Sequence, residues 1–131
     1  MKFICFGFHN ETNTAEMTES ERKSFRERCF SYDDELRRNG HLSGAEALQP
    51  STNAMTIRYR SGEVIVTDGP YAETKEQIGG LLLLEARDLN HAIQLMKRHP
   101  GIRAGGIEIR AANEEINALI AARTAKIAPV S

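Results

Sequence analysis

The segment 67–77, TDGPYAETKEQ, places an aromatic ring and several ionisable side chains directly after an Asp-Gly-Pro turn. An Asp at such a turn normally accepts a hydrogen bond from the backbone N–H two residues later. Pro70 has no N–H, so the carboxylate of Asp68 must find a later amide, a cation, water or a ligand. Two interpretations stay open. Either Asp68 and Glu73 tie the loop to its own amides or to Lys75, or at least one of them contacts a ligand.

Histidine is the side chain best suited to proton exchange near neutral pH. His99 precedes Pro100, where a histidine either ends a helix, with its charged form favoured by the helix dipole, or lines a pocket. His9 lies next to a polar loop. A metal site built from His9, His99 and Asp68 would lack the local ligand spacing of metal centres, so we predict no metal and no cofactor.

The secondary structure predicted around these residues follows a βα pattern. Residues 2–8 are nearly all apolar and predict a strand buried on both faces. Thr18, with Glu21 three residues later, predicts a capping box that starts a helix, and Asn39-Gly40 predicts its end. Four residues of this helix recur at helical spacing and predict its apolar face: Phe25, Cys29, Tyr32 and Leu36. Cys29 is therefore predicted to serve packing.

The middle of the chain predicts strands. Residues 41–48 form a weaker second strand, and Pro50 then breaks the chain. The segments MTIRYR and EVIVT are joined by Ser61-Gly62 and predict a two-residue β-hairpin over 54–67. Four consecutive leucines, 81–84, predict another strand that is buried on both faces.

The remaining signals complete the βα order. Asp88 predicts the start of a second amphipathic helix, which His99-Pro100-Gly101 closes. The segment GIEIRA alternates and predicts a half-exposed strand. Asn113 opens a C-terminal helix, so the chain is predicted to be one domain, 1–131, with 112–131 as a helical extension.

This order is β-α-β-β-α-β once the hairpin and the last helix are set aside. It predicts an α+β protein of the ferredoxin-like, split βαβ plan. Helices cover only one sheet face in that plan, whereas the strands at 2–8 and 81–84 have no polar side. A second sheet is the expected cover, so we predict a back-to-back homodimer.

Length and charge exclude several classes of protein. A chain of 131 residues with a formal net charge of −1 has no basic field for nucleic acid. The sequence contains no run of eighteen apolar residues, so no membrane span is predicted. Two cysteines are too few for a disulfide framework, and a cytoplasmic location is expected.

Several motifs resemble one family. The segments VTDGPYAETKEQIGG, RHPG and GGIEIR, together with MKFICFGF and ELRRNGHLSGAEALQPS, are similar to the DGPF group of the YCII-related family over about residues 1–111. Tyr71 stands where the name-giving Phe usually occurs. The resemblance implies a dimeric α/β barrel of ferredoxin-like subunits and a genomic association with extracytoplasmic-function sigma factors. It implies no established activity.

The resemblance also directs attention to one pair of residues. The wider YCII family is proposed to use a His on the first helix and an Asp in an Asp-Pro step after the second. Here the first helix contains no His, and His99-Pro100 stands at the Asp-Pro step. The acid–base argument of the family is therefore lost in its usual form.

The topology predicts that the end of the first strand, the loop after the hairpin and the end of the second helix lie together. This predicted rim comprises His9, Asp68, Tyr71, Glu73, Lys75, Glu76 and His99, with His41 and His91 at the opposite end. A homodimeric small-ligand-binding or regulatory protein that contacts its ligand through this rim is the favoured function. The alternative is a cofactor-free enzyme in which His99 and Asp68 perform acid–base catalysis.

Overall fold

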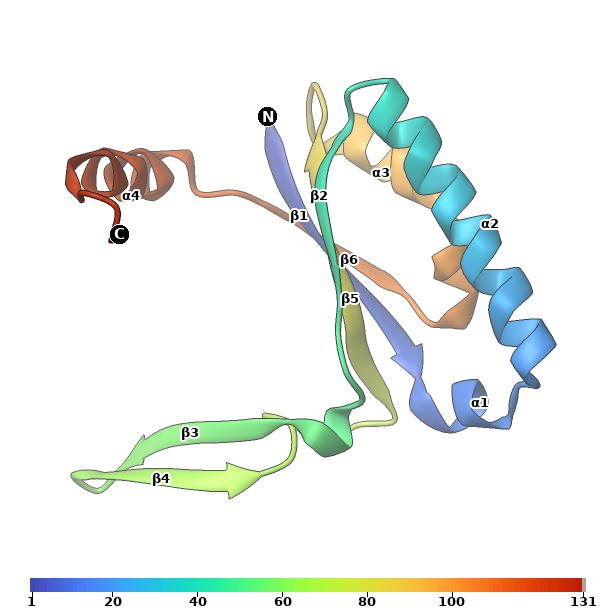
Figure 1. The fold of residues 1–131 in the computed structure, drawn as a ribbon, viewed down its shortest axis with the longest axis horizontal. Helices are drawn as coiled ribbons and strands as arrows, with labels where there is room; N and C mark the ends of the chain where they lie inside the picture. The colour runs from blue at the N-terminus through green and yellow to red at the C-terminus, as the bar shows by residue number, and fades with distance from the viewer. Residues whose placement is uncertain (131) are drawn as a thin grey trace.

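A computed structural model describes residues 1–130 and shows a mixed α+β protein (Figure 1). Four antiparallel strands form the main sheet in the order β2-β5-β1-β6. Their bounds are Lys2–Asn10 for β1, Leu42–Ala47 for β2, Glu76–Glu85 for β5 and Ile107–Ala111 for β6. The strands at both ends of the sequence therefore meet in one sheet, and the prediction of an α+β class is confirmed.

Helices cover one face of this sheet. These are α2 (Glu19–Arg38) and α3 (Leu89–Lys97), with the 3₁₀ helix η2 (Pro100–Ala104) following α3 (Figure 1). The alternating side chains of the central strands point towards them, and Phe3, Cys5 and Leu84 are fully buried there. The helices contribute the rest of this core: Leu36, Ala92, Leu95 and Met96.

The opposite face of the sheet is open. Ile4 is paired with Leu83 and Phe6 with Leu81, and these four side chains alternate with the buried set. They are only half-buried because no helix of residues 1–130 covers them. The two-sided burial expected for 2–8 and 81–84 is thus present on one side alone within a single chain.

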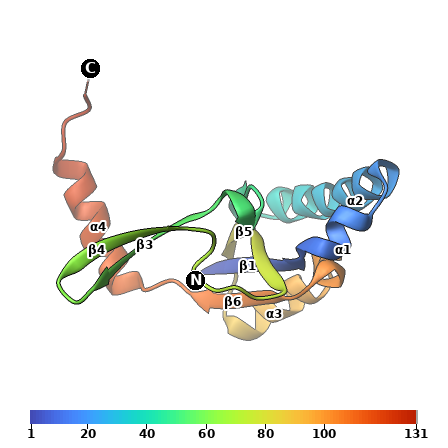
Figure 2. The ribbon, with the colours of Figure 1, turned by 90° about the horizontal axis from the view of Figure 1, so that it is seen from below.

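The hairpin forms a second sheet that stands away from the first. Strands β3 (Met55–Arg60) and β4 (Glu63–Asp68) are joined by Ser61 and Gly62, both at positive φ, 49° and 82°. Two positive φ values define the type I′ turn that suits the twist of a hairpin, and they confirm the predicted two-residue connection. The hairpin extends from the side of the sheet opposite α2 (Figures 1 and 2).

The C-terminal helix α4 (Glu114–Lys126) extends on this same side (Figures 1 and 2). None of its residues is buried in the single chain. Its predicted start is confirmed, because the Asn113 side chain accepts a hydrogen bond from the Ile116 N–H at 3.0 Å. The extension therefore forms a regular helix without packing on its own sheet.

Local signals also set the ends of the other long helices. The Thr18 side chain and Glu21 form the predicted capping box, and the Asp88 side chain caps α3. Two short elements were not predicted, α1 (Glu11–Glu16) and η1 (Ser51–Asn53). Neither has an apolar periodicity, and Glu11 accepts hydrogen bonds from Ser51 that tie them together.

Two features concern the molecule as a whole. The strands of residues 1–130 form no closed barrel. In the same residues, every helix is too short or too polar to cross a bilayer.

Candidate functional site

A buried histidine–aspartate pair joins the two helices of the covered face. His99 is 7% exposed and Asp33, on α2, is 9% exposed. His99 Nε2 lies 2.8 Å from Asp33 Oδ1, and the Gly101 N–H donates to His99 Nδ1 at 2.9 Å. A backbone N–H can only donate, so Nδ1 is the unprotonated nitrogen. In the neutral ring this contact selects the tautomer whose Nε2–H donates to the Asp33 carboxylate.

The local sequence explains why His99 stays in this position. Pro100 cannot continue α3, and it occupies the first position of η2, with His99 as the capping residue. Tyr32 meets the His99 ring edge-on at 5.5 Å between centroids and donates to the Leu95 carbonyl at 2.6 Å. The end of α3 is thereby held against α2 by hydrogen bonds as well as by apolar packing.

The cysteine thiols are poor nucleophiles. Burial raises the pKa of the Cys5 thiol to about 11. Burial also raises the pKa of Cys29, and the nearby Asp33 carboxylate adds to this effect, against the smaller influence of Arg28. Both side chains are thus protonated at neutral pH, in agreement with the packing role predicted for Cys29.

A cavity of about 630 Å³ lies beside the histidine–aspartate pair, where α2 faces the end of α3 and η2. Part of its lining consists of Phe25, His99, Pro100 and Ile102. The other lining residues are all cationic, namely Arg28, Lys97, Arg98 and Arg103. Its size is in the range of pockets that hold small ligands, about 300–1,000 Å³.

Two residues of the predicted rim lie at one end of the main sheet. In the register of β1 with β5, His9 is opposite Gln77 and Asn10 is opposite Glu76. The imidazole of His9 packs beside Gly79, where a larger residue would collide with it, and its Nδ1 is 3.1 Å from Thr14 Oγ1. Gly79 thus permits the close approach of β5 to the His9 ring.

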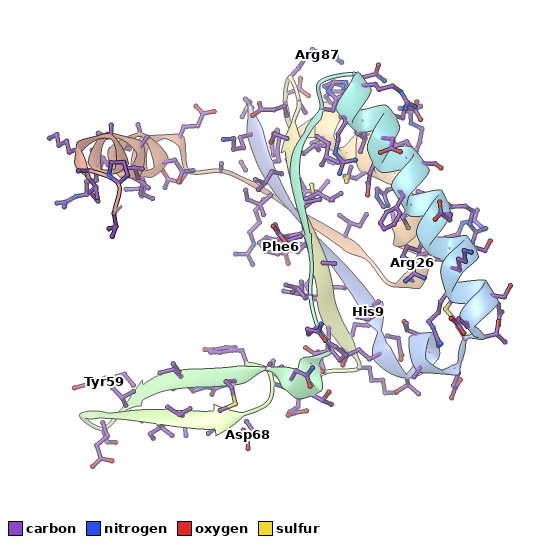
Figure 3. All side chains as sticks on the ribbon, in the orientation of Figure 1. Phe6, His9, Arg26, Tyr59, Asp68 and Arg87 are labelled. Carbon is purple, nitrogen blue, oxygen red and sulfur yellow. The ribbon has the colours of Figure 1, made fainter. Side chains whose placement is uncertain are left out.

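The loop after the hairpin lies elsewhere. Asp68 ends β4 and is exposed, and Figure 3 shows it on the hairpin, apart from His9 at the end of β1. Asp68 makes no hydrogen bond or ion pair within residues 1–130. Gly69 adopts φ = 101°, which other residues rarely tolerate. The carboxylate that contacts His99 is therefore Asp33, and not Asp68.

The other loop residues are equally accessible. Tyr71 is 76% exposed, and the Arg58 guanidinium lies 4.3 Å from the centre of its ring. A Glu73 carboxylate oxygen approaches Gly69, and Lys75 and Glu76 are exposed. A single chain does not close a pocket around them.

Sequence reasoning missed Asp33. No role was predicted for Asp33, yet it is four residues after Cys29 and three before Leu36, on the apolar face of α2. A lone acid on an apolar helical face was the available signal, because a buried carboxylate needs a partner. Among residues 1–130, no group of three or more His, Cys, Asp or Glu side chains is arranged to hold a metal ion.

The fold and the site define an α+β subunit with helices on one sheet face and a histidine–aspartate pair between its two covering helices. The model of the YCII-related domain matches residues 1–115, and the chain belongs to the YCII-related family. A similar protein is "Uncharacterized protein R00369" of Rhizobium meliloti (strain 1021), 43% identical over 58 residues. The matched segment covers 44% of this chain and 47% of that protein, whose name states no activity.

The His99–Asp33 pair can be compared with the pattern that the family resemblance implied. In the expected family pattern the helix supplies the His and the step before Pro supplies the Asp. Here α2 supplies Asp33 and the residue before Pro100 is His99. The same two kinds of side chain therefore occur with their positions exchanged relative to that expected pattern.

Proposed function

We propose that this protein binds a small ligand in the cavity beside His99, and that it does so as a homodimer. The observation that carries the proposal is a concave pocket of about 630 Å³ next to a buried, hydrogen-bonded histidine. Both ring nitrogens of His99 are already bonded, so the ring is held in one orientation. A rigid wall of this kind suits selective binding, because little side-chain entropy is lost when the ligand enters.

Three uncovered apolar surfaces support the homodimer. The first is the open sheet face with Ile4, Phe6, Leu81 and Leu83. The second is one face of the hairpin, on which the register aligns Met55, Ile57, Tyr59, Val64 and Val66, each more than half exposed. The third is α4, with Ile116, Leu119, Ile120 and Ile127. All three belong to the side opposite α2, and a second copy would bury them together.

The strand order supports a finer assignment of fold and group. In the order β2-β5-β1-β6 each covering helix connects strands that have another strand between them, as in a ferredoxin-like subunit. Two such sheets face to face would give the dimeric α/β barrel. The segment VTDGPYAETKEQIGG supports membership of the DGPF group, with Tyr71 in place of Phe. Two free cysteines support a cytoplasmic location.

The loop residues of the predicted rim retain a role in this proposal. Asp68, Tyr71, Glu73, Lys75 and Glu76 would contact ligand separately from the His99 cavity, at the dimer interface, since the hairpin extends from the open side of the sheet (Figure 1). The absence of an intramolecular partner for Asp68 within residues 1–130 supports this. A regulatory role beside an extracytoplasmic-function sigma factor rests on the resemblance to the DGPF group.

Ligand binding is tested by filling the cavity. A fragment mixture added to the full chain should shift the amide NMR signals of Gly101, Ile102 and Arg103. Ile102→Trp should abolish these shifts, because the indole would occupy the cavity. The matched control is Ile93→Trp, since both isoleucines are 38% exposed and Ile93 does not line the cavity. Shifts that persist in Ile102→Trp would contradict the proposal.

The cofactor-free enzyme is a second candidate, favoured by the hydrogen bond between His99 and Asp33 at the cavity wall. A proton taken up at Nδ1 would break the bond from Gly101, so catalysis requires η2 to move. If an identified ligand is converted, His99→Gln should lower the rate by on the order of 10²–10⁴-fold with the dimer intact. His41→Gln, at the opposite end, should leave the rate unchanged.

A further inference from the structure

The cavity beside His99 collects positive charge. Arg28 comes from α2, Lys97 and Arg98 from the end of α3, and Arg103 from η2. No acidic residue lines the cavity, and none of the four cations forms an ion pair within residues 1–130. The whole chain has 17 Lys and Arg against 18 Asp and Glu, so this concentration does not reflect a basic protein.

Three acids close to the cavity, Asp33, Glu27 and Glu35, do not pair with these cations. The Asp33 carboxylate is buried behind His99 and accepts its Nε2–H. Glu27 and Glu35 line a neighbouring depression, which shares only Arg28 and Pro100 with the cavity. Four cations around one concave space repel each other and focus a positive potential into it. An anion that enters would relieve this repulsion.

The remaining walls of the cavity are apolar and indicate that its ligand also carries an apolar group. Phe25, Pro100 and Ile102 present apolar surface to the cavity. The Arg28 guanidinium lies 5.9 Å from the Phe25 ring centre and that of Arg98 lies 5.8 Å from the Tyr32 ring centre, so aromatic rings support two of the cations. The lining therefore combines apolar walls with cationic side chains.

We propose that this cavity binds an organic anion, a carboxylate or phosphate attached to an apolar body. The inference rests on the proposed small-ligand function and adds the chemical class of the ligand. Guanidinium groups bind both oxyanions through paired N–H donors, and lysine adds a point charge. The cavity belongs to the covered side of the sheet, so the dimer proposed on the open side leaves it accessible.

Three probes of one shape test the charge requirement: 1-naphthoate, 1-naphthyl phosphate and the neutral 1-naphthamide. Each is titrated into the full chain while the Gly101 and Ile102 amides and the arginine side-chain N–H signals are followed by NMR. At least one anion should bind ten times or more tightly than the amide, with an affinity that falls as NaCl is raised. The stronger of the two anions distinguishes a carboxylate site from a phosphate site.

Charge-removing variants supply the control. Arg28→Gln and Arg103→Gln should each lower the affinity for the anion about three- to tenfold, since a charge-assisted hydrogen bond is lost. Lys23→Gln removes an exposed cation of α2 outside the cavity and should change nothing. If all three probes bind equally and the variants have no effect, the anion class is wrong and the small-ligand site stands. If no probe shifts Gly101 or Ile102 at millimolar concentration, both proposals fail.

Discussion

Asp33 and His99 show how two side chains, 66 positions apart in the sequence, define a site. Each would be costly to bury alone, because a carboxylate or an imidazole N–H without a partner loses its hydration. Together with the Gly101 amide they satisfy both nitrogens of the ring. The bond also fixes the tautomer, so the face that His99 presents to the cavity is constant.

Asp33→Ala should lower the free energy of unfolding by about 1–3 kcal/mol, because the buried Nε2–H of His99 loses its acceptor. Urea denaturation measures this. Asp34→Ala is the matched control, since Asp34 pairs with Arg37 on the exposed side of α2 and such pairs contribute at most about 1 kcal/mol. Equal losses in the two variants would show that the pair has no structural role.

Cys29 reports on the same carboxylate. Burial and the Asp33 charge raise the pKa of the Cys29 thiol. In a Cys5→Ser variant, where Cys29 is the remaining cysteine, alkylation by iodoacetamide should therefore be slow at pH 7.5. The rate should rise only at a pH above that at which an ordinary thiol ionises. Asp33→Asn removes a negative charge, favours the thiolate and should shift the rate profile to lower pH. Mass spectrometry of labelled protein gives the rates. A profile that does not move would exclude Asp33 as a cause of the raised pKa.

At the scale of elements, the site depends on how η2 meets the end of β1. The Phe8 N–H donates to the Gly106 carbonyl at 2.8 Å, and the Gly105 backbone lies directly against the Phe8 carbonyl. This contact places η2, and with it Arg103 and the Gly101 amide, against the sheet. The geometry of the cavity is thus set by backbone contact as much as by side chains.

Gly105→Ala should destabilise the protein by about 1–3 kcal/mol, because the added methyl group would collide with the Phe8 carbonyl and force η2 to shift. Gly106→Ala is the control, since a methyl group there meets no atom within 4 Å. Thermal unfolding compares the two variants. A Gly105→Ala protein as stable as Gly106→Ala would mean that η2 is not held by this contact.

At the scale of the whole molecule, one side of the sheet is complete and the other is not. Helices α2 and α3 cover the first, whereas the hairpin and α4 extend from the second without covering it (Figure 2). Exposed apolar residues on a sheet, a hairpin and a helix together exceed what monomers usually show to water. An obligate interface of this kind should bury roughly 2,000 Å² or more.

Leu83→Asp should prevent the proposed dimer and leave a folded monomer, because Leu83 faces the open side and a carboxylate there opposes association. Leu82→Asp should instead prevent folding, since Leu82 packs against the core beneath the helices. Light scattering and circular dichroism separate the two outcomes. A wild-type monomer at low micromolar concentration, or a Leu83→Asp protein that still dimerises, would contradict the proposed interface.

Local structure in this protein follows from neighbouring residues in the chain. Thr18, Asp88 and Asn113 each accept a hydrogen bond from an amide three residues later, so the starts of α2, α3 and α4 depend on neighbours in the chain. The Ser61-Gly62 turn is local in the same way. Apolar runs, the hairpin turn and the alternation of GIEIRA placed the strands, but α1 lacked any such pattern and was missed.

The site depends instead on packing between elements that are distant in the sequence. Topology predicted that the end of the first strand, the loop after the hairpin and the end of the second helix would converge. His9 and Glu76 do lie together at one end of the sheet. Topology could not predict that the hairpin turns away and takes Asp68 with it, or that Asp33 faces His99. Those outcomes depend on packing angles between elements distant in sequence, where no single residue type fixes the geometry. The four cations around the cavity are brought together by the same packing of α2 against α3 and η2.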